Sequence, residues 1–563
     1  MGAANCGAAS RSPSSSSSSN SGVTSRSSSR SSNSSRGDPQ RSQSPIISPR
    51  RCWAKSQTPA PQSWCGQTSL HVPRPFDMVG SSFADDDMVA QSVAPAAHAT
   101  AQPEPDVSGH GPLSISTRIE YTALPRGRAQ DVFGIVTVQA DAIMAQTDTE
   151  KRQPLDVICV LDVSGSMTGQ KLSLVQDAVR FVIGESQPQD RLSIVTFNSS
   201  AQRPLRLCCM DGRGKDEATA ATLRLTAGGG TCIANGLETA LEVAEKRRQR
   251  NPVSAILLLT DGQDGSSRQQ LPSLVARAQR TGCSLYTFGF GADHDARLLA
   301  DLAEQAQTPF TFVEDVDQIG AAFAGAVGGL ASVAAQRVEV VLDTHATLKA
   351  VHTPFSVSRE GPRVVVQIPD MLAGERRDVL VELSVAAETG PSDDTLLLQA
   401  SAKYWNLTAS AAAQTPSVEM RLVRQADDEP QPELEPDEEV ATQRNRVEVA
   451  QALQVATAHG DEGRFDEAQA VLAAHEQRLR SAKRKTAVSE SLLVELEDAR
   501  HRMSSFASWH GGGSAEVRDS MQMHLTHRTT NMSTSSKCTT KKKSSKSMYL
   551  TSYQTSWVSK WGA

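Results

Sequence analysis

Residues 154–166 read Pro-Leu-Asp-Val-Ile-Cys-Val-Leu-Asp-Val-Ser-Gly-Ser, an apolar run followed by a cluster of oxygen-bearing side chains. A nearly continuous apolar run of this length predicts a β-strand covered on both faces, as in a parallel sheet. Leu172, Val175 and Val179 then lie on one stripe of a broadly apolar helix, which would pack against such a sheet. A buried strand followed by this kind of helix is typical of an α/β fold.

The same alternation continues along the chain to residue 313. Further buried strands are predicted at 191–197, 253–259, 284–290 and 310–313, and further helices at 233–244, 271–280 and 295–305. Strands and helices that alternate in this way predict a doubly wound, Rossmann-like α/β domain with helices on both faces of the sheet. In such a domain, the loops at the carboxyl ends of the strands form the ligand crevice.

The regions on both sides of this domain have other periods. Apolar residues recur with period two before residue 140 and again in 338–342, 364–368, 379–385 and 396–402, which predicts one β-sandwich built from both flanks. Helical stripes after residue 440 predict a C-terminal helical hairpin or three-helix unit. The predicted division is 1–110 disordered Ser/Arg/Pro-rich tail, 111–150 strands of the flanking sandwich, 151–335 α/β domain, 336–425 β-sandwich, 426–440 acidic linker, 441–508 helical unit and 509–563 disordered Ser/Thr/Lys tail.

Composition restricts the class of protein. The chain has 563 residues, a net charge of −6 and 4% aromatic residues, which argues against a dedicated nucleic-acid binder. The longest stretch of small and apolar residues, 321–335, is too short and too rich in glycine to cross a bilayer, so we expect no membrane span. Nine cysteines without framework spacing, and an N-terminus without an apolar run, favour a reducing, cytoplasmic location.

Oxygen-bearing side chains gather where the predicted strands end. Asp162, Ser164 and Ser166 follow the first buried strand, Thr231 follows three consecutive glycines, and Asp261 follows the strand at 253–259. Carboxylate and hydroxyl oxygens suit a hard divalent cation, Mg²⁺ or Mn²⁺. Alone, Asp-x-Ser-x-Ser is more often a helix-capping loop; together with two further donors at strand ends it predicts a metal site.

This constellation resembles the von Willebrand factor type A domain with a complete metal-ion-dependent adhesion site, whose five positions match Asp162, Ser164, Ser166, Thr231 and Asp261. The resemblance implies that residues 151–335 are this domain. In that family the metal keeps one coordination position for a carboxylate of the bound partner. The implied function is a divalent-cation-dependent adhesion or scaffold module that captures an Asp or Glu of a partner protein.

A second resemblance covers roughly residues 110–560. Leu155–Gly165, Asn251–Asp264 and Tyr286–Asp295 are similar to plant RING-finger ubiquitin ligases of the WAVY GROWTH type, which carry this A domain. In that family a RING precedes the A domain and recruits the ubiquitin-conjugating enzyme. A RING needs eight Cys or His zinc ligands, largely in Cys-x-x-Cys pairs, and residues 1–110 contain no such pair. The departure implies that this chain by itself does not ligate ubiquitin.

Catalytic interpretations have weaker support. The sequence has no Gly-x-x-x-x-Gly-Lys phosphate loop and no Gly-x-Ser-x-Gly elbow, and residues 289–294 lack the third glycine of a dinucleotide turn. His294, between Asp293 and Asp295, is a candidate metal ligand or base, but helix capping explains this group better. We therefore predict a non-enzymatic binding protein. The alternatives are a substrate-binding component of a RING-type ligase, with contacts to the ubiquitination machinery, and an A domain whose metal site is unused. Replacing Asp162 or Asp261 by Ala is predicted to abolish capture and leave the fold intact.

Overall fold

The computed structural model describes residues 85–89, 111–142, 152–292, 294–387, 394–426, 435–482, 485–530 and 545–562. Most of the predicted tail over 1–110 and most of the acidic linker over 426–440 lie outside these residues. The predictions made for those parts therefore remain predictions.

The α/β domain contains a six-stranded sheet in the order β6-β5-β4-β7-β8-β9. Its strands are β4 (Leu155–Asp162), β5 (Arg191–Phe197), β6 (Ala201–Cys209), β7 (Val253–Thr260), β8 (Ser284–Phe290) and β9 (Phe310–Val313). All neighbours are parallel except β6, which runs antiparallel to β5. Every residue of β4 is buried, as its continuous apolar run predicts for a strand covered on both faces.

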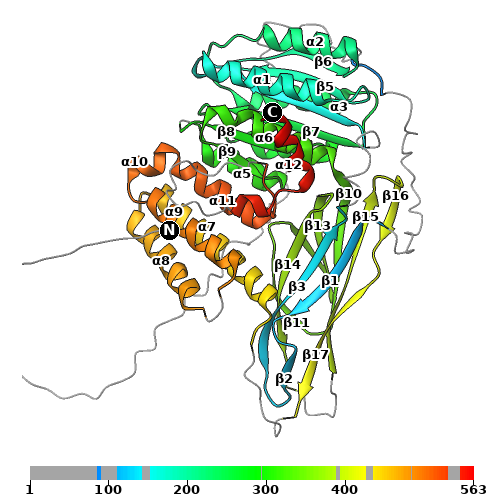
Figure 1. The fold of residues 1–563 in the computed structure, drawn as a ribbon, viewed down its shortest axis with the longest axis vertical. Coiled ribbons are helices and arrows are strands. Elements are labelled where there is room, and N and C mark those ends of the chain that lie inside the picture. The colour runs from blue at the N-terminus through cyan, green and yellow to red at the C-terminus, as the bar shows by residue number, and fades with distance from the viewer. Residues whose placement is uncertain are drawn as a thin grey trace, which may run out of the picture. The chain divides into compact units, whose positions relative to one another are not determined.

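Six helices cover the two faces of this sheet. They are α1 (Gln170–Glu185), α2 (Gly212–Leu223), α3 (Ile233–Lys246), α4 (Leu271–Thr281), α5 (Ala296–Ala306) and α6 (Ile319–Ala331). The apolar residues of α1, α2 and α6 share one core with one face of the sheet, and those of α3, α4 and α5 share a second core with the other face. The arrangement is visible in the upper part of Figure 1. The predicted doubly wound α/β fold is confirmed.

Two further sheets enclose a core of their own. The first has the order β1-β3-β14-β11, and the second has the order β12-β13-β10-β15-β17-β2 with β16 on β15. Their strands are β1 (Leu113–Ile119), β2 (Ala123–Pro125), β3 (Gln130–Ala140), β10 (Val333–Thr344), β11 (Thr347–His352), β12 (Ser356–Glu360), β13 (Arg363–Leu372), β14 (Arg376–Val385), β15 (Asp394–Asn406), β16 (Ala411–Gln414) and β17 (Val418–Gln425). Because β3 pairs with β14 from Gln130 to Gln139, both flanks of the α/β domain contribute to one β-sandwich, as predicted.

The chain continues in helices after the sandwich. They are α7 (Glu438–Asp461), α8 (Phe465–Ser481), α9 (Ala487–Arg502), α10 (Phe506–Ser508), α11 (Ser514–Thr526) and α12 (Ser552–Trp561), with a π-helical turn at Trp509–Gly513. Asp437 caps α7 by accepting hydrogen bonds from the amides of Glu439 and Val440, both at 3.0 Å. The first helix therefore begins inside the segment predicted as the linker.

The prediction of a disordered tail over 509–563 is wrong for 509–530 and 545–562. Helix α11 packs against α7, α5 and β9, and α12 packs against α6 (Figure 1). Gln522 of α11 accepts a hydrogen bond from the amide of Phe310 at 2.9 Å, and the buried Arg528 forms ion pairs with Asp370 and Glu375, both at 2.7 Å. Composition alone misses these contacts because their partners come from distant parts of the sequence.

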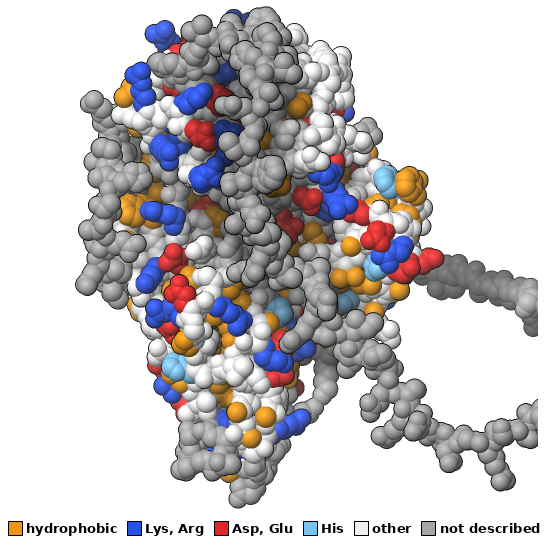
Figure 2. Space-filling model, turned by 180° about the vertical axis from the view of Figure 1, so that it is seen from behind, with side chains coloured by type: hydrophobic (Ala, Val, Ile, Leu, Met, Phe, Trp, Pro, Cys, Tyr) orange, Lys and Arg blue, Asp and Glu red, His pale blue; other side chains and the backbone are white. Residues whose placement is uncertain are grey.

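The surface carries charges of both signs. On the face viewed in Figure 2, Lys and Arg side chains are interspersed with Asp and Glu side chains among the residues that are not grey. Within the described ranges, none of the helices combines the length and the apolarity needed to pass through a bilayer.

Candidate metal centre

The sheet register brings the predicted site residues together. β4 and β7 are parallel neighbours, with Leu161 opposite Leu259. Asp162 is the last residue of β4, and Asp261 directly follows the end of β7. The two carboxylates therefore lie side by side at the carboxyl ends of adjacent strands, the edge of a doubly wound sheet where ligands bind.

Asp162 is fully buried and held by two donors. Its Oδ1 accepts a hydrogen bond from the amide of Ser164 at 2.8 Å, and its Oδ2 accepts one from the hydroxyl of Thr260. Burial raises the pKa of Asp162, while the hydrogen bonds from Ser164 and Thr260 oppose the rise and the nearby charge of Asp261 adds to it. A cation beside this carboxylate would offset the burial of its charge.

Hydroxyl groups link the two carboxylates. The Oγ atoms of Ser164 and Ser166 are hydrogen-bonded at 3.0 Å, and Ser166 Oγ donates to Asp261 Oδ1 at 2.7 Å. Ser164 is buried, whereas Ser166 is exposed. Ser166 belongs to a short 3₁₀ helix, Gly165–Met167, which follows β4 closely, and Ser164 is the N-cap of this helix. Four of the predicted donors thus form one connected group that opens to solvent at Ser166.

The glycine-rich loop before Thr231 packs onto the same turn. The amide of Gly228 donates to the carbonyl of Val163 at 2.8 Å, and the amide of Gly165 donates to the carbonyl of Gly229 at 3.0 Å. Thr231 lies against Gly262, where a Cβ atom would come within 2.7 Å of Thr231 Oγ1. The fifth predicted donor therefore lies beside Asp261, and the close approach requires glycine at position 262.

Three further residues, which are not among the predicted site residues, shape this site. The ammonium group of Lys171, near the start of α1, forms an ion pair with Asp261 Oδ2. Thr260 donates to Asp162, as described above. Asp264 accepts a hydrogen bond from the amide of Ile233 at 2.7 Å and so fixes the start of α3 two residues after Thr231. Asp264 follows Asp261 at a spacing of three, which was the one available signal; Lys171 belongs to no pattern.

Hydrogen bonds also set the charge state of Asp264. Burial alone would raise the pKa of Asp264, but hydrogen bonds from Ser266, Ser267 and the amide of Ile233 outweigh it and lower the pKa below its usual value. Asp264 is therefore a fixed anion behind the loop that carries Thr231.

The donor set fits a hard cation. Two carboxylates and three hydroxyls are oxygen donors, and the ammonium group of Lys171 already lies where positive charge is favoured. Among the residues that the structure describes, no group of three or more His, Cys, Asp or Glu side chains could hold a metal ion. Of residues 1–110 the structure describes only Asp85–Val89, which contain no Cys or His. Every Cys and His of residues 1–110 therefore lies outside the described residues.

In the group around His294, the predicted capping role is observed for Asp295, and Asp293 lies outside the described residues. Asp295 is the N-cap of α5 and accepts a hydrogen bond from the amide of Leu298 at 3.0 Å. His294 Nδ1 lies 2.8 Å from the carbonyl oxygen of Gly291. Asp295 therefore caps the helix, and His294 contacts the turn that precedes it.

Comparison with known proteins identifies the α/β domain. The family model of the von Willebrand factor type A domain matches residues 156–324. A solved structure described as "von Willebrand factor type A from Catenulispora acidiphila" covers 75% of this chain and 97% of its own, with a TM-score of 0.55 and 17% sequence identity. At this identity the likeness shows the fold alone, and it extends beyond the α/β domain.

Two curated relatives come from Arabidopsis thaliana. The E3 ubiquitin-protein ligase WAV3 is 34% identical over 252 residues, which are 42% of this chain and 32% of WAV3. The probable E3 ubiquitin-protein ligase WAVH2 is 25% identical over 312 residues, which are 53% of this chain and 42% of WAVH2. The chain therefore spans about a third to two-fifths of the length of these relatives.

Proposed function

Because residues 156–324 form a von Willebrand factor type A domain, we propose that the chain is a divalent-cation-dependent protein-binding module that captures an acidic residue of a partner protein. Domains of this family are typically metal-dependent protein-interaction modules and are generally not enzymes. The observation that supports the proposal most strongly is the convergence of five oxygen donors at the ends of β4 and β7, next to the ammonium group of Lys171.

The roles of the residues follow from their contacts. Ser164, Ser166 and Thr231 would hold Mg²⁺ or Mn²⁺ through hydroxyl oxygens, and Asp162 and Asp261 would supply the negative charge. A bound divalent ion would supply a positive centre to which a partner carboxylate can bind. Ser166 is exposed, so a partner can approach from its side, while Thr260 and the amide of Ser164 keep Asp162 oriented.

Metal binding is tested first, without any partner. Titration calorimetry with Mg²⁺, and electron paramagnetic resonance with Mn²⁺, would compare the full chain with Ser166→Ala and Thr231→Ala. We expect each variant to lose about tenfold or more in affinity, a loss seen even when outer-shell partners of a metal are removed. Ser173→Ala, at an exposed position of α1, is the matched control. Equal affinity in all four proteins would contradict the proposal.

Partner capture is tested second. Proteins from the native cell extract would be captured on the wild-type chain and on Ser166→Ala, each with Mg²⁺ and with chelator, and identified by mass spectrometry. We expect a partner that only the wild-type chain retains and only with Mg²⁺. The same proteins in all four captures would show that the metal site is not the contact.

A second candidate function is suggested by the relatives that are named as ubiquitin ligases. The chain would then be the substrate-binding component of a RING-type ligase, with the RING on another polypeptide. The same capture distinguishes the two proposals, because only the second expects RING proteins or ubiquitin-conjugating enzymes among the partners. We place either activity in the cytoplasm, which the free thiols of the described cysteines support.

A further inference from the structure

Five residues that precede the sandwich, Asp85–Val89, lie along the outer edge of β6; we call them the acidic segment. The amide of Asp87 donates to the carbonyl of Leu207 at 2.9 Å. In the opposite direction, the amide of Leu207 donates to Asp86 Oδ1 and the amide of Cys209 donates to Asp87 Oδ2, both at 3.0 Å. The prediction of a disordered tail over 1–110 is therefore wrong for these five residues.

These contacts supply hydrogen-bond partners for backbone groups at the outer edge of β6, where the sheet has no further strand. β6 is the terminal strand of its sheet, so one row of its backbone N–H groups has no neighbouring strand. Unpaired strand edges are a general liability, because they attract other strands. Here carboxylate oxygens of the acidic segment accept two of those hydrogen bonds. A charged acceptor makes each bond stronger than a neutral carbonyl would.

Two arginines of β6 add charge recognition. Arg203 donates from one nitrogen to both carboxylate oxygens of Asp85, at 2.7 and 2.8 Å, and from another to Asp86 Oδ1 at 2.8 Å. Arg206 forms an ion pair with Asp87 at 3.3 Å. Each of the three consecutive aspartates thus has an arginine partner on the same strand, and a segment without carboxylates could not make these contacts.

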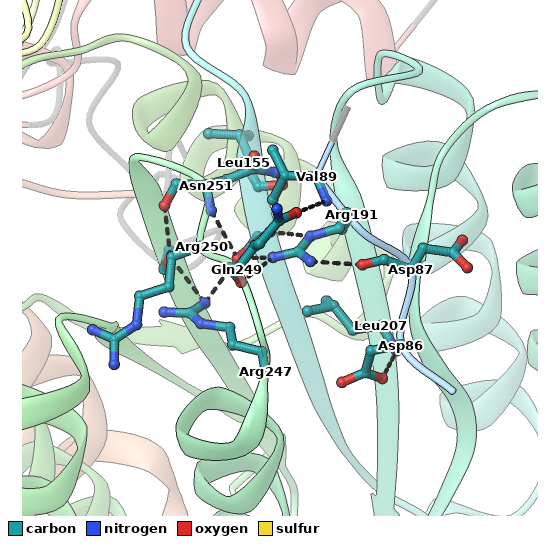
Figure 3. A network of polar contacts seen from close by, with 12 residues as sticks. Asp86, Asp87, Val89, Leu155, Arg191, Leu207, Arg247, Gln249, Arg250 and Asn251 are labelled. Carbon is teal, nitrogen blue, oxygen red and sulfur yellow. Dashed lines mark hydrogen bonds and ion pairs between the residues drawn. The ribbon is translucent and has the colours of Figure 1, made fainter. Parts of the chain in front are cut away.

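A third arginine, Arg191 of β5, donates a hydrogen bond to the backbone of the acidic segment. Arg191 is buried at the start of β5 and forms two hydrogen bonds with the carboxylate of Asp156, at 2.8 and 2.7 Å. Its remaining nitrogen donates to the carbonyl of Asp87 at 2.8 Å, and the amide of Val89 donates to the side chain of Gln249 at 2.7 Å (Figure 3). Because Asp156 fixes the guanidinium group, this donor is oriented before the segment arrives.

We propose that the outer edge of β6 is a docking site for an acidic linear peptide, and that the acidic segment is a tethered ligand that occupies it. The site recognises consecutive carboxylates and an extended backbone. It does not rely on an apolar pocket, since Met88 leaves 51% of its surface exposed. A partner protein that carries a run of aspartates offers the same groups and competes with the tethered ligand. The site contains none of the metal-site residues, so this inference does not depend on the proposed function.

Peptide binding to a vacated site is the direct test. The full chain with the three aspartates of the acidic segment changed to Ala would be titrated into a fluorescent peptide of residues 83–91, with anisotropy as the readout. We expect the vacated chain to bind at least about tenfold more tightly than the wild-type chain, whose own segment competes for the site. A peptide with Ser at the three Asp positions should not bind.

A second substitution shows where the peptide binds. Adding Arg203→Met to the vacated chain should weaken binding about tenfold or more, because it removes the partner of two carboxylates. Arg213→Met, at an exposed position of the nearby α2, is the matched control and should change nothing. No binding to the vacated chain, or equal binding with and without Arg203→Met, would overturn the proposal.

Amide hydrogen exchange gives an independent readout. The amides of Leu207 and Cys209 should exchange about tenfold faster or more in the vacated chain, and saturating peptide should restore their protection. Unchanged exchange in the vacated chain, or peptide binding without restored protection, would overturn the proposal. If the wild-type chain is a dimer and the vacated chain is a monomer, the acidic segment docks on a second copy of the chain. This result would overturn the proposal that the segment occupies the site of its own chain. An unchanged far-ultraviolet circular dichroism spectrum verifies that the vacated chain is folded.

Discussion

The C-terminal helix α12 should stabilise the α/β domain, and Trp557→Ala is the substitution that tests it. The indole of Trp557 is 4% exposed and belongs to the same core as α1 and α6. The indole packs directly against the backbone of α6 at Gly328, where a Cβ atom would come within 2.8 Å of Trp557 Cγ. The ring of Phe181 meets it edge to face at a centroid distance of 6.3 Å.

The magnitude follows from this burial. Truncation of a buried tryptophan to alanine typically costs about 3–5 kcal/mol, because transfer and cavity terms add. The loss in stability cannot exceed the free energy that the packing of α12 contributes, since once the helix has detached the substitution has no further effect. Other contacts also dock the helix, among them the hydrogen bonds from Gln554 Nε2 to the carbonyls of Gly325 and Thr529, both at 3.1 Å. We therefore expect Trp557→Ala to lower the free energy of unfolding of the α/β domain by about 3 kcal/mol or more.

Urea unfolding followed by far-ultraviolet circular dichroism measures this loss without relying on the removed fluorophore. Limited proteolysis should also cleave the variant near residue 552 faster than the wild-type chain. Ser556→Ala, at an exposed position of the same helix, is the control and should stay within about 0.5 kcal/mol of the wild-type chain. A loss below about 1 kcal/mol for Trp557→Ala would refute the reasoning, because the helix would then contribute little to the fold.

Three further predictions concern the metal site and the pH dependence. Lys171→Met should raise Mg²⁺ affinity in calorimetry by about fivefold, since it removes a competing ion pair with Asp261 worth about 1 kcal/mol. Gly262→Ala should weaken Mg²⁺ binding and lower the free energy of unfolding by about 1–3 kcal/mol, because the new methyl group displaces Thr231. Burial, with the charges of nearby arginines, lowers the pKa of His527 well below 6.5, so the unfolded chain binds a proton that the folded chain excludes. The free energy of unfolding should therefore fall by up to about 1.4 kcal/mol per pH unit below pH 6.5, and His527→Asn, which suits the positive φ of this position, should reduce that slope in urea titrations.

The sequence predicts the doubly wound sheet well because its strands are buried on both faces. Six of the seven residues of β8 (Ser284–Phe290) are buried, and its observed limits are those predicted from the sequence. The sequence does not predict β6 (Ala201–Cys209), because its first half contains Gln, Arg and Pro and only partly buried or exposed positions. Its outer edge is completed by the acidic segment, and no local pattern of the sequence indicates that pairing.

The missed C-terminal helices have a different cause. The segment around α12 is polar, so its composition predicts a tail. Thr551 and Gln554 nevertheless form a capping box, which is a sequence signal for a helix start. What composition cannot indicate is the receiving surface. α6 is rich in glycine, and residues such as Gly328 leave room for an aromatic side chain from a distant segment. Such pairing depends on tertiary structure alone.

At the candidate metal site the sequence predicts which side chains come together but not how deeply they are buried. All five predicted donors come together, yet Asp162 is fully buried and accepts hydrogen bonds from Thr260 and the amide of Ser164. The expectation that Asp162→Ala leaves the fold intact is therefore not supported, because it would leave buried donors unpaired. Ser166 and Thr231 are more accessible, so their variants separate metal binding from folding more cleanly.

The metal site and the proposed peptide site should act independently, because the sheet separates them. The Asp156–Arg191 pair lies near the amino ends of β4 and β5, whereas Arg203, which binds Asp85, lies near the carboxyl end of β5 and is the part of the peptide site nearest to Asp162. Arg203 belongs to β6, the second strand from β4, and two spacings between strands amount to about 10 Å, slightly more than the distance over which charges interact through physiological salt. Binding of the 83–91 peptide to the vacated chain should therefore have the same affinity with Mg²⁺ and with chelator. A change of more than about threefold would mean that a movement of the sheet or its helices connects the two sites, which would then have to be treated as one coupled system.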